Sequence, residues 1–361
     1  MTAGVWDAAE RTVVSVPDVL LKLKQFDSLI DVRTEDEFEI DHLPGAINLP
    51  VLTNTERVEV GTMDRQQSSF EARRRGAAYV SRNIAHHLET RFDSMPKSWR
   101  PLVYCWRGGN RSGAMTHILR CVGWQARQLE GGYRAYRRQV VADLATQPVY
   151  LSLRVVCGTT GSGKSRLLQE LCAQGAQVLD LEALAHHRGS VLGGLPAQRQ
   201  PSQKMFETRL WSALHSFDPE RIVFVESESR KIGELRVPDA LLKLMRASEC
   251  VRLEVPLRAR IRLLRGEYEH FESDRDLLDA QLDCLSALHG RQKIERWKAL
   301  ARADNWDDVV EQLLVEHYDP AYLKSIDRNF ERAADANIMR IESDAIEDYQ
   351  AAARKLVTLV S

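Results

Sequence analysis

The chain has 361 residues, of which 44% are hydrophobic and 28% charged, and its formal net charge is -1. These values exclude a disordered chain, and the length exceeds one average domain of about 100–200 residues, so we predict two domains. No apolar run approaches the ~18 residues that a membrane span requires, and no basic and apolar secretory signal begins the chain. We therefore expect a cytoplasmic protein without transmembrane helices.

The N-terminal part alternates short strands with helical segments. Between the first strands and the third, the polar, arginine-rich residues 55–99 have helical spacing and predict an inserted set of helices. Gly131 and Gly132 then open a basic helix that leads to a boundary near Gln147 and Pro148. The expected domains are thus 1–146 and 147–361. The elements predicted in the first are strands at 28–33 and 102–104, a short strand within the loop 41–50, and helices at 35–40, 112–122 and 133–145.

A cysteine heads the loop after the third strand. Cys105 is followed by Arg107, two glycines and Arg111, and a helix begins at about Ser112. In a strand–loop–helix unit the backbone N–H groups converge on an anion at the helix N-terminus. The arginines should lower the pKa of the thiol and present it as an exposed thiolate nucleophile. The alternative is a buried structural cysteine, which would need neither the double glycine nor the arginines.

The other cysteines and the histidine pairs give no comparable signal. The six cysteines include no CxxC pair, which argues against a zinc site or a disulfide framework, and apart from Cys105 we expect small core residues. The pairs 86–87 and 186–187 are adjacent histidines, which point about 100° apart on a helix. We therefore predict no metal site from them.

The second domain begins with a strand at 149–157, a glycine-rich loop at 158–165 and a helix at 165–173. This context is the one that a phosphate-binding loop (P-loop, Walker A) requires. Further strands at 177–181 and 221–225 predict a parallel sheet with crossover helices, and the chain from Pro256 onward is expected to be mainly helical. Both domains are therefore expected to be α/β.

The loop itself predicts the chemistry of the second domain. Its backbone N–H groups should face phosphate oxygens, Lys164 adds a positive charge, and the Ser165 hydroxyl suits Mg²⁺. ATP, GTP or the diphosphate of another molecule would fit equally. Glu226, at the end of a neighbouring strand, and Arg230 are expected to join this site; a surface ion-pair cluster is the alternative. The loop residues are Gly158, Thr159, Thr160, Gly161, Ser162, Gly163, Lys164 and Ser165.

Positive charge is concentrated in the first domain. Residues 64–140 contain fifteen Lys and Arg against five Asp and Glu, a local balance of +10. Such a surplus can hold a nucleic-acid backbone, although solvated helix faces or internal ion pairs would give the same pattern.

Several motifs of the first domain resemble a rhodanese domain over residues 12–140. They are Leu29–Arg33 with Glu37, His42–Ala46, Asn48–Pro50 and the Cys105 loop. Arg111 lies six residues after Cys105, where the common sulfurtransferase pattern has five. The wider loop is similar to that of rhodanese-like phosphatases and arsenate reductases, which weighs against simple thiosulfate sulfurtransfer.

Nearly the whole chain resembles the tRNA 2-selenouridine synthase family. The resemblance rests on the loops 105–112 and 158–165 and on the segments 187–190, 226–233 and 318–322. It implies a transferase that converts wobble 2-thiouridine in the tRNA anticodon to 2-selenouridine. The implied co-substrates are selenophosphate and geranyl diphosphate, with S-geranylation first and displacement of the geranyl thiol by selenium second; Mg²⁺ is compatible with the second domain.

The resemblance assigns roles to residues of both domains. It implies that Cys105 handles selenium as a covalent perselenide or by positioning alone. The implied catalytic residues are Cys105, Arg107, Arg111 and Lys164; those implied to hold the diphosphate are 158–165, Glu226 and Arg230; and the candidate tRNA contacts are Arg73, Arg74, Arg75, Arg134, Arg137 and Arg138.

Two other functions fit the same motifs. The first is a P-loop ATPase or kinase with a regulatory rhodanese module, which would turn over ATP without tRNA. The second is a non-catalytic persulfide carrier, in which Lys164→Ala would have no effect.

Overall fold

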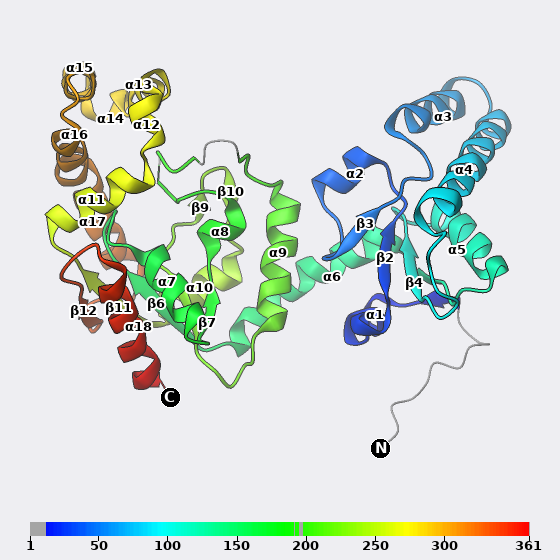
Figure 1. Ribbon diagram of the computed structural model, residues 1–361, viewed down its shortest axis with the longest axis horizontal. Coiled ribbons are helices and arrows are strands. Elements are labelled where there is room, and N and C mark those ends of the chain that lie inside the picture. The colour runs from blue at the N-terminus through cyan, green and yellow to red at the C-terminus, as the bar shows by residue number, and fades with distance from the viewer. Residues whose placement is uncertain (1–11, 191, 195–197, 361) are drawn as a thin grey trace. The chain divides into compact units, whose positions relative to one another are not determined.

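The computed structural model describes residues 12–190, 192–194 and 198–360 (Figure 1). The contacts divide the chain into two units. The N-terminal unit contains the residues up to Asp143 together with Glu207–Arg209, and the C-terminal unit contains the rest. Each unit is built on a five-stranded parallel sheet, so the predicted α/β fold is confirmed.

The sheet of the N-terminal unit has the order β1-β5-β4-β2-β3. The central strands β2 and β4 are buried along most of their length, as expected of parallel strands covered on both faces. The carboxyl end of β4 delivers the Cys105 loop. The strands are β1 (Val13–Val14), β2 (Ser28–Asp31), β3 (Ala46–Asn48), β4 (Pro101–Tyr104) and β5 (Arg127–Leu129).

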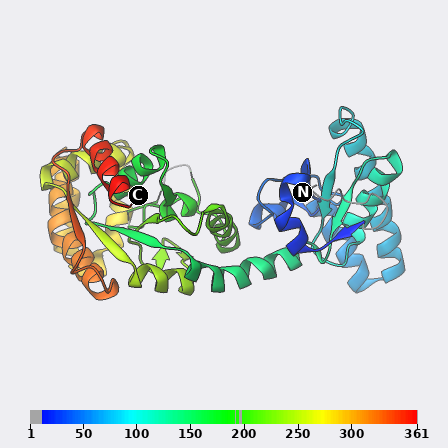
Figure 2. The same cartoon turned by 90° about the horizontal axis from the view of Figure 1, so that it is seen from below.

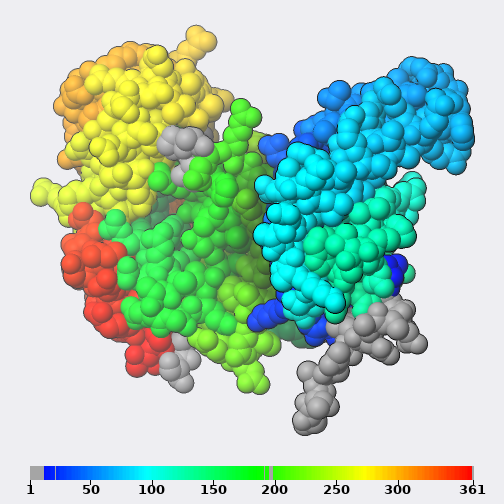
Figure 3. Space-filling view, turned by 45° about the vertical axis from the view of Figure 1, so that its right-hand side comes forward, coloured from blue at the N-terminus to red at the C-terminus, as the bar shows by residue number. Residues whose placement is uncertain are grey.

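The helices of this unit include the expected insertion. The segment 55–99 forms two long helices that lie side by side, α3 and α4, and they stand out from the rest of the unit (Figure 3). A capping box between Thr53 and Glu56 fixes the start of α3. The helices are α1 (Val16–Leu21), α2 (Glu35–Ile40), α3 (Asn54–Gln66), α4 (Ser69–Arg91), α5 (Asn110–Val122) and α6 (Gly132–Thr146), with a 3₁₀ turn at Leu23–Gln25.

The sheet of the C-terminal unit has the order β12-β11-β6-β8-β7. Its first strand starts at Leu153, later than expected, because Gln147–Tyr150 forms a 3₁₀ turn. Strands β11 and β12 were not predicted; the chain after Pro256 is mainly helical, as expected, with β12 as its one strand among the described residues. The strands are β6 (Leu153–Cys157), β7 (Gln177–Leu179), β8 (Val223–Glu226), β11 (Glu249–Glu254) and β12 (Asn337–Arg340), and β9 (Lys231–Ile232) pairs with β10 (Leu235–Arg236) in a separate hairpin.

Helices flank this sheet and add a second core. Leu167 and Leu171 of α7 and Tyr349 of α18 belong to the core that packs on the sheet. A second cluster, centred on Trp297, fills a helical region between β11 and β12, whose orange helices form one end of the unit in Figure 2. The helices are α7 (Lys164–Ala173), α8 (Leu181–Ala185), α9 (Gln203–Ser216), α10 (Asp239–Ala247), α11 (Leu257–Glu267), α12 (His270–Ser273), α13 (Arg275–Asp283), α14 (Ser286–His289), α15 (Arg291–Arg302), α16 (Trp306–Leu313), η3 (Leu314–Tyr318), α17 (Asp319–Asn329) and α18 (Ile346–Val360).

The cysteines divide evenly between the interior and the surface. Cys105, Cys157 and Cys250 are buried, whereas Cys121, Cys172 and Cys284 are exposed, so the expectation of core positions is wrong for these three. Each exposed cysteine lies on or just after an amphipathic helix, on its solvent side. Within the described residues, no helix combines the length and apolar character needed to cross a bilayer.

Candidate active sites of the two units

The phosphate-binding loop connects β6 to α7 in the C-terminal unit. Gly161 and Gly163 have φ angles of +76° and +70°, a conformation that side chains disfavour. A Cβ on Gly161 would also lie 2.7 Å from Leu264, and one on Gly163 would overlap the ring of Tyr349. The helix α7 starts at Lys164, so its free N-terminal N–H groups face the loop. The loop is therefore shaped to receive an anion.

Two side chains of the loop carry its polar chemistry. Lys164 is buried, with its Nζ donating to the Gly158 carbonyl at 3.3 Å and lying 5.4 Å from the centre of the Tyr322 ring. Ser165 Oγ donates to Glu182 Oε2 at 2.8 Å. A phosphate oxygen that enters the loop would meet the Lys164 ammonium, which makes one long hydrogen bond to the loop, and the Ser165 hydroxyl, which lies beside the Glu182 carboxylate.

A cavity of about 1230 Å³, open to solvent, lies in front of the loop. Three cationic side chains line it, those of Lys164, Arg166 and Arg188. Three acidic residues, Asp180, Glu182 and Glu267, line it as well. Burial raises the pKa of all three carboxyls, although Lys164 partly opposes the shift for Glu182, and Arg188 that for Glu267. Because these carboxyls resist ionisation, the cavity favours anions more than its formal charges suggest.

Two further glutamates lie behind the cavity. Glu226 is fully buried, and burial followed by the neighbouring Asp180, Glu182 and Glu228 raises its pKa well above the ordinary value. Burial and then Glu182 raise the pKa of Glu228 to about 8. Near neutral pH the Glu228 carboxyl therefore holds a proton for most of the time, and the raised pKa of Glu226 acts in the same direction, so the group of acids carries less negative charge than fully ionised side chains would.

The helical region between β11 and β12 forms a hydrogen bond with the backbone of the P-loop. Arg260 of α11 donates from Nε to the Thr160 carbonyl at 2.9 Å. Its guanidinium also forms two hydrogen bonds with the Asp319 carboxylate, at 2.9 and 2.5 Å. The segment 318–322 therefore contributes both Asp319, which fixes the loop through Arg260, and Tyr322, whose ring faces Lys164.

The two residues expected to complete the diphosphate site differ in their placement. Glu226 does end β8 next to β6, but its Oε1 accepts the Glu182 backbone N–H at 2.9 Å, so it supports the cavity wall from behind. Arg230 is exposed and pairs with Asp239 at 3.1 Å. It does not line the cavity. The strand β8 ends at Glu226, and the polar run after it leads to the β9–β10 hairpin.

The cysteine loop lies at the corresponding place in the N-terminal unit, between β4 and α5. Cys105 is only 2% exposed, which corrects the expectation of an exposed thiolate. Ser112 Oγ donates to its sulfur at 3.2 Å, and the thiol faces the Arg107 carbonyl at 3.4 Å. Gly109 caps α5 with a φ of +79°. The sulfur thus sits at a helix N-terminus, where an anion would be stabilised.

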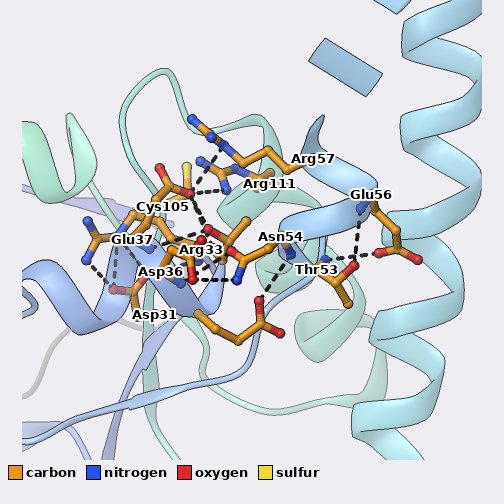
Figure 4. Close-up of polar contacts among 12 residues, drawn as sticks. Asp31, Arg33, Asp36, Glu37, Thr53, Asn54, Glu56, Arg57, Cys105 and Arg111 are labelled. Carbon is orange, nitrogen blue, oxygen red and sulfur yellow. Dashed lines mark hydrogen bonds and ion pairs between the residues drawn. The ribbon is translucent and has the colours of Figure 1, made fainter. Parts of the chain in front are cut away.

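A carboxylate shares this cradle with the arginines. Arg111 Nη1 contacts Glu37 Oε2 at 3.0 Å, and Arg57 of α3 contacts the same oxygen at 3.5 Å (Figure 4). Burial opposes ionisation of Glu37, but the two arginines outweigh it and lower the pKa of this carboxyl. Arg107 is exposed. Glu37 therefore holds two cations in place and neutralises part of their charge until an anion arrives.

The floor of the cysteine loop is a stack of aromatic rings. The exposed Trp106 stacks on the buried Tyr133, with ring centres 5.4 Å apart. Tyr133 donates to Asp41 at 2.6 Å and lies 4.0 Å from the guanidinium of the buried Arg33. A Cβ on Gly132 would collide with the Cys105 carbonyl, so this glycine permits the close approach of α6 to the loop.

The candidate tRNA contacts lie on two helices of the N-terminal unit. Arg73, Arg74 and Arg75 are exposed on α4; Arg74 pairs with Glu71 at 2.6 Å and Arg75 with Glu59 at 3.0 Å. On α6, Arg134 and Arg138 are exposed and Arg137 is half-buried. Part of the local positive charge is thus compensated by neighbours.

The histidine pairs have structural partners. His87 contacts the Pro50 carbonyl at 2.9 Å, and His187 accepts the Gly189 N–H at 3.1 Å. Among residues 12–190, 192–194 and 198–360, no group of three or more His, Cys, Asp or Glu side chains is arranged to hold a metal ion.

Sequence reasoning missed part of both sites. The missed residues had weak signals: Glu37 and Tyr322 occur in the resembling motifs, but Arg57, Asp180, Glu182 and Arg260 have no motif of their own. Their roles depend on contacts between elements that lie far apart in sequence, from 17 residues for Ser165 and Glu182 to 100 for Thr160 and Arg260.

A rhodanese-type unit with a cysteine loop, followed by a P-loop unit with a phosphate cavity, defines the class of this protein. The Rhodanese-like domain family matches residues 16–139, and the tRNA 2-selenouridine synthase AAA domain family matches residues 151–281. Both matches agree with the two units described above.

Whole-chain relatives specify the family. The tRNA 2-selenouridine synthase of Nitrosomonas europaea is 32% identical over 345 residues, 83% of this chain and 89% of the relative. That of Hydrogenovibrio crunogenus is 32% identical over 81% of this chain and 88% of its own length. That of Nitrosomonas eutropha is 38% identical over 66% of this chain and 62% of its own. The chain belongs to the tRNA 2-selenouridine synthase family, and the predicted assignment to a tRNA-modifying transferase is confirmed.

Proposed function

We propose that this protein replaces the sulfur of wobble 2-thiouridine in tRNA by selenium in two steps, with geranyl diphosphate and selenophosphate as co-substrates. One observation carries the proposal: the chain holds two separate anion cradles, each at a helix N-terminus, and only one of them contains a thiol. Two different phosphorus-bearing substrates fit two such cradles better than one nucleotide would.

The first step is assigned to the P-loop cavity. The thiouridine sulfur attacks C1 of geranyl diphosphate, the S–C1 bond forms, the C1–O bond breaks, and the base loses its N3 proton. Diphosphate leaves with the bonding electron pair. Lys164 and the N-terminal N–H groups of α7 would stabilise that charge as it develops.

Ser165 and Glu182 are the residues of this cavity that fit Mg²⁺. Their oxygens are 2.8 Å apart, and hydroxyl and carboxylate oxygens suit this hard cation. When bound, the ion would neutralise part of the diphosphate charge.

The second step is assigned to the Cys105 loop. Selenium attacks C2 of the S-geranylated base, the C2–S bond breaks, and geranyl thiol leaves; hydrolysis of the P–Se bond releases phosphate. A perselenide on Cys105 would require a two-electron oxidation of the selenium that neither co-substrate supplies. Positioning of the donor by Arg111, Arg57 and the α5 N-terminus is therefore the role we assign, with the Cys105 thiol as hydrogen-bond partner and proton source.

The tRNA contacts are proposed on α4 and α6. Arg73, Arg74, Arg75, Arg134, Arg137 and Arg138 supply cationic side chains for backbone phosphates. Neighbouring carboxylates pair with three of them, Arg74, Arg75 and Arg137, before tRNA binds.

Diphosphate release tests the proposal against its two alternatives. Purified protein is incubated with geranyl diphosphate, with and without thiolated tRNA, and with ATP in a parallel reaction. We expect release of diphosphate that requires tRNA and stops after one equivalent per thiolated nucleoside. ATP hydrolysis without tRNA would support the ATPase or kinase function instead, and no turnover of either compound would support the persulfide carrier.

A further inference from the structure

An apolar pocket adjoins the phosphate cavity in the C-terminal unit. It is partly open, and its walls surround about 600 Å³ of space that is continuous with solvent. Its walls come from the P-loop and from the helical region, including α11, α12, α16 and η3. The residues that line both this pocket and the phosphate cavity are Thr160, Ser190, Leu264 and Tyr268.

Leu264 marks the junction between the two spaces. Its side chain packs directly on the backbone of the P-loop, since a Cβ on Gly161 would lie 2.7 Å from its Cδ1. A ligand whose phosphates occupy the loop therefore meets a hydrocarbon surface immediately beyond them.

The walls beyond Leu264 are aliphatic and aromatic. Phe271, Leu278, Trp306, Val309 and Leu313 line them, and each is less than 9% exposed. The charged members, Arg265 and Glu272, pair with each other at 3.0 Å and are about one-third exposed, which places them toward solvent. A purine would bring several polar edge atoms against walls that offer few partners, at a cost in desolvation. A branched hydrocarbon chain would bring none.

We propose that this pocket holds the isoprenoid tail of an allylic diphosphate whose head group occupies the P-loop. The inference rests on the proposed function and specifies where the chain-length preference arises. Wall residues on α16 and η3 limit the tail to about the length of geranyl, so the helical region determines which chain length the protein binds.

The experiment compares affinity with chain length, using the full protein. Calorimetric titrations give the Kd of inorganic diphosphate, geranyl diphosphate and farnesyl diphosphate. Because each buried methylene in such a pocket changes affinity by about tenfold or more, the geranyl compound should bind at least about 100-fold more tightly than inorganic diphosphate.

Two variants alter the pocket in opposite directions. Val310→Phe, at a half-buried wall position, should weaken geranyl diphosphate binding at least about tenfold and leave inorganic diphosphate within about twofold. Leu313→Ala enlarges the pocket and should shift preference toward farnesyl diphosphate by about tenfold. Leu282→Ala is the matched control, since Leu282 belongs to the same core but does not line the pocket.

The outcomes separate this inference from the proposed function. The pocket assignment would be overturned if Leu313→Ala and Leu282→Ala changed the Kd values equally. It would also be overturned if Val310→Phe weakened the binding of ATP as much as that of geranyl diphosphate. If the variants shift chain-length preference but the wild type transfers no geranyl group to tRNA, the tail pocket stands and the proposed reaction fails. If transfer occurs with unchanged preference in both variants, only the tail pocket fails.

Discussion

Arg260 and Asp319 form a pair of hydrogen bonds, at 2.9 and 2.5 Å, and this pair orients the guanidinium that contacts the P-loop backbone. Arg260 is 6% exposed and also donates to the Thr160 carbonyl. The helical region thus serves the phosphate site in two ways: it pins one loop carbonyl, and it presents the ring of Tyr322 to Lys164.

Asp319→Ala tests this support. Removing the carboxylate leaves a buried guanidinium unpaired, and we expect a loss of about 3 kcal/mol in the free energy of unfolding, at the lower end for broken buried pairs because Asp319 is partly exposed. Urea denaturation measures this loss, and the KM for geranyl diphosphate should rise as the loop loosens. Asp327→Ala, at an exposed position of the same helix, is the control. Equal stability of the two variants would contradict the account.

Lys164→Ala tests the diphosphate cradle. Loss of one preorganised group that stabilises developing charge costs about 10²- to 10³-fold in rate, and we expect geranylation of tRNA to fall by that factor. Single-turnover kinetics of S-geranyl nucleoside formation give the number. Lys355→Ala, on the exposed side of α18, should behave as wild type. A normal rate in the Lys164 variant would remove the P-loop from the mechanism.

Cys105→Ala tests the division of labour between the units. Because the thiol belongs to the other cradle, this change should abolish formation of 2-selenouridine and leave geranylation intact, so that S-geranyl nucleoside accumulates. Cys121→Ala, at an exposed cysteine of the same unit, serves as the comparison. Loss of both reactions in a folded Cys105 variant would argue for a single shared site.

Glu228 gives the protein a characteristic pH dependence. Its pKa is about 8 in the folded protein against an ordinary value of 4.5, so between these two pH values the folded state binds a proton that the unfolded state has released. The contribution of Glu228 to stability is therefore fully present below pH 4.5 and declines as the pH rises toward 8. Glu228→Gln should flatten this decline in denaturation curves at pH 6 and 8.5. The exposed Glu220→Gln should leave the slope as it is; an unchanged slope in Glu228→Gln would show that the carboxyl ionises normally.

Charge reversal on α4 tests the tRNA surface. Replacing Arg73, Arg74 and Arg75 by Glu should weaken tRNA binding and reduce the slope of log K against log salt by roughly one unit for each phosphate that the protein no longer neutralises. Filter binding at several salt concentrations measures both quantities. Arg354→Glu on α18, an exposed arginine of the other unit, is the control. If affinity and slope match the wild type, α4 does not bind tRNA.

Local sequence determined much of the fold. The glycines of both loops and the buried runs of β2 and β4 are signals within a few residues, and the corresponding elements formed close to where they were expected, whereas β6 began four residues late. Strands β11 and β12 were missed because Glu249–Glu254 and Asn337–Arg340 are short, begin and end with polar or charged residues, and lie among helices. Only their pairing in the sheet distinguishes them.

The sequence predicted those residues of each site that belong to a single loop. Lys164, Ser165, Cys105 and Arg111 lie at helix N-termini that their own segments create. The partners of these residues come from elsewhere: Glu37 reaches Arg111 across 74 residues, and Arg260 reaches Thr160 across 100. Such contacts follow from the order of strands and the packing of helices, which a single sequence does not specify. Arg230 shows the converse: it follows Glu226 closely in sequence, yet it pairs with Asp239 and does not line the cavity.

The most direct test of the central claim is mass spectrometry of tRNA nucleosides after stepwise addition of the co-substrates. With geranyl diphosphate alone, the account predicts conversion of wobble 2-thiouridine to its S-geranyl derivative, and subsequent selenophosphate should convert that derivative to 2-selenouridine with release of geranyl thiol. Formation of 2-selenouridine from selenophosphate alone, or unchanged thiouridine in the presence of both compounds, would contradict it.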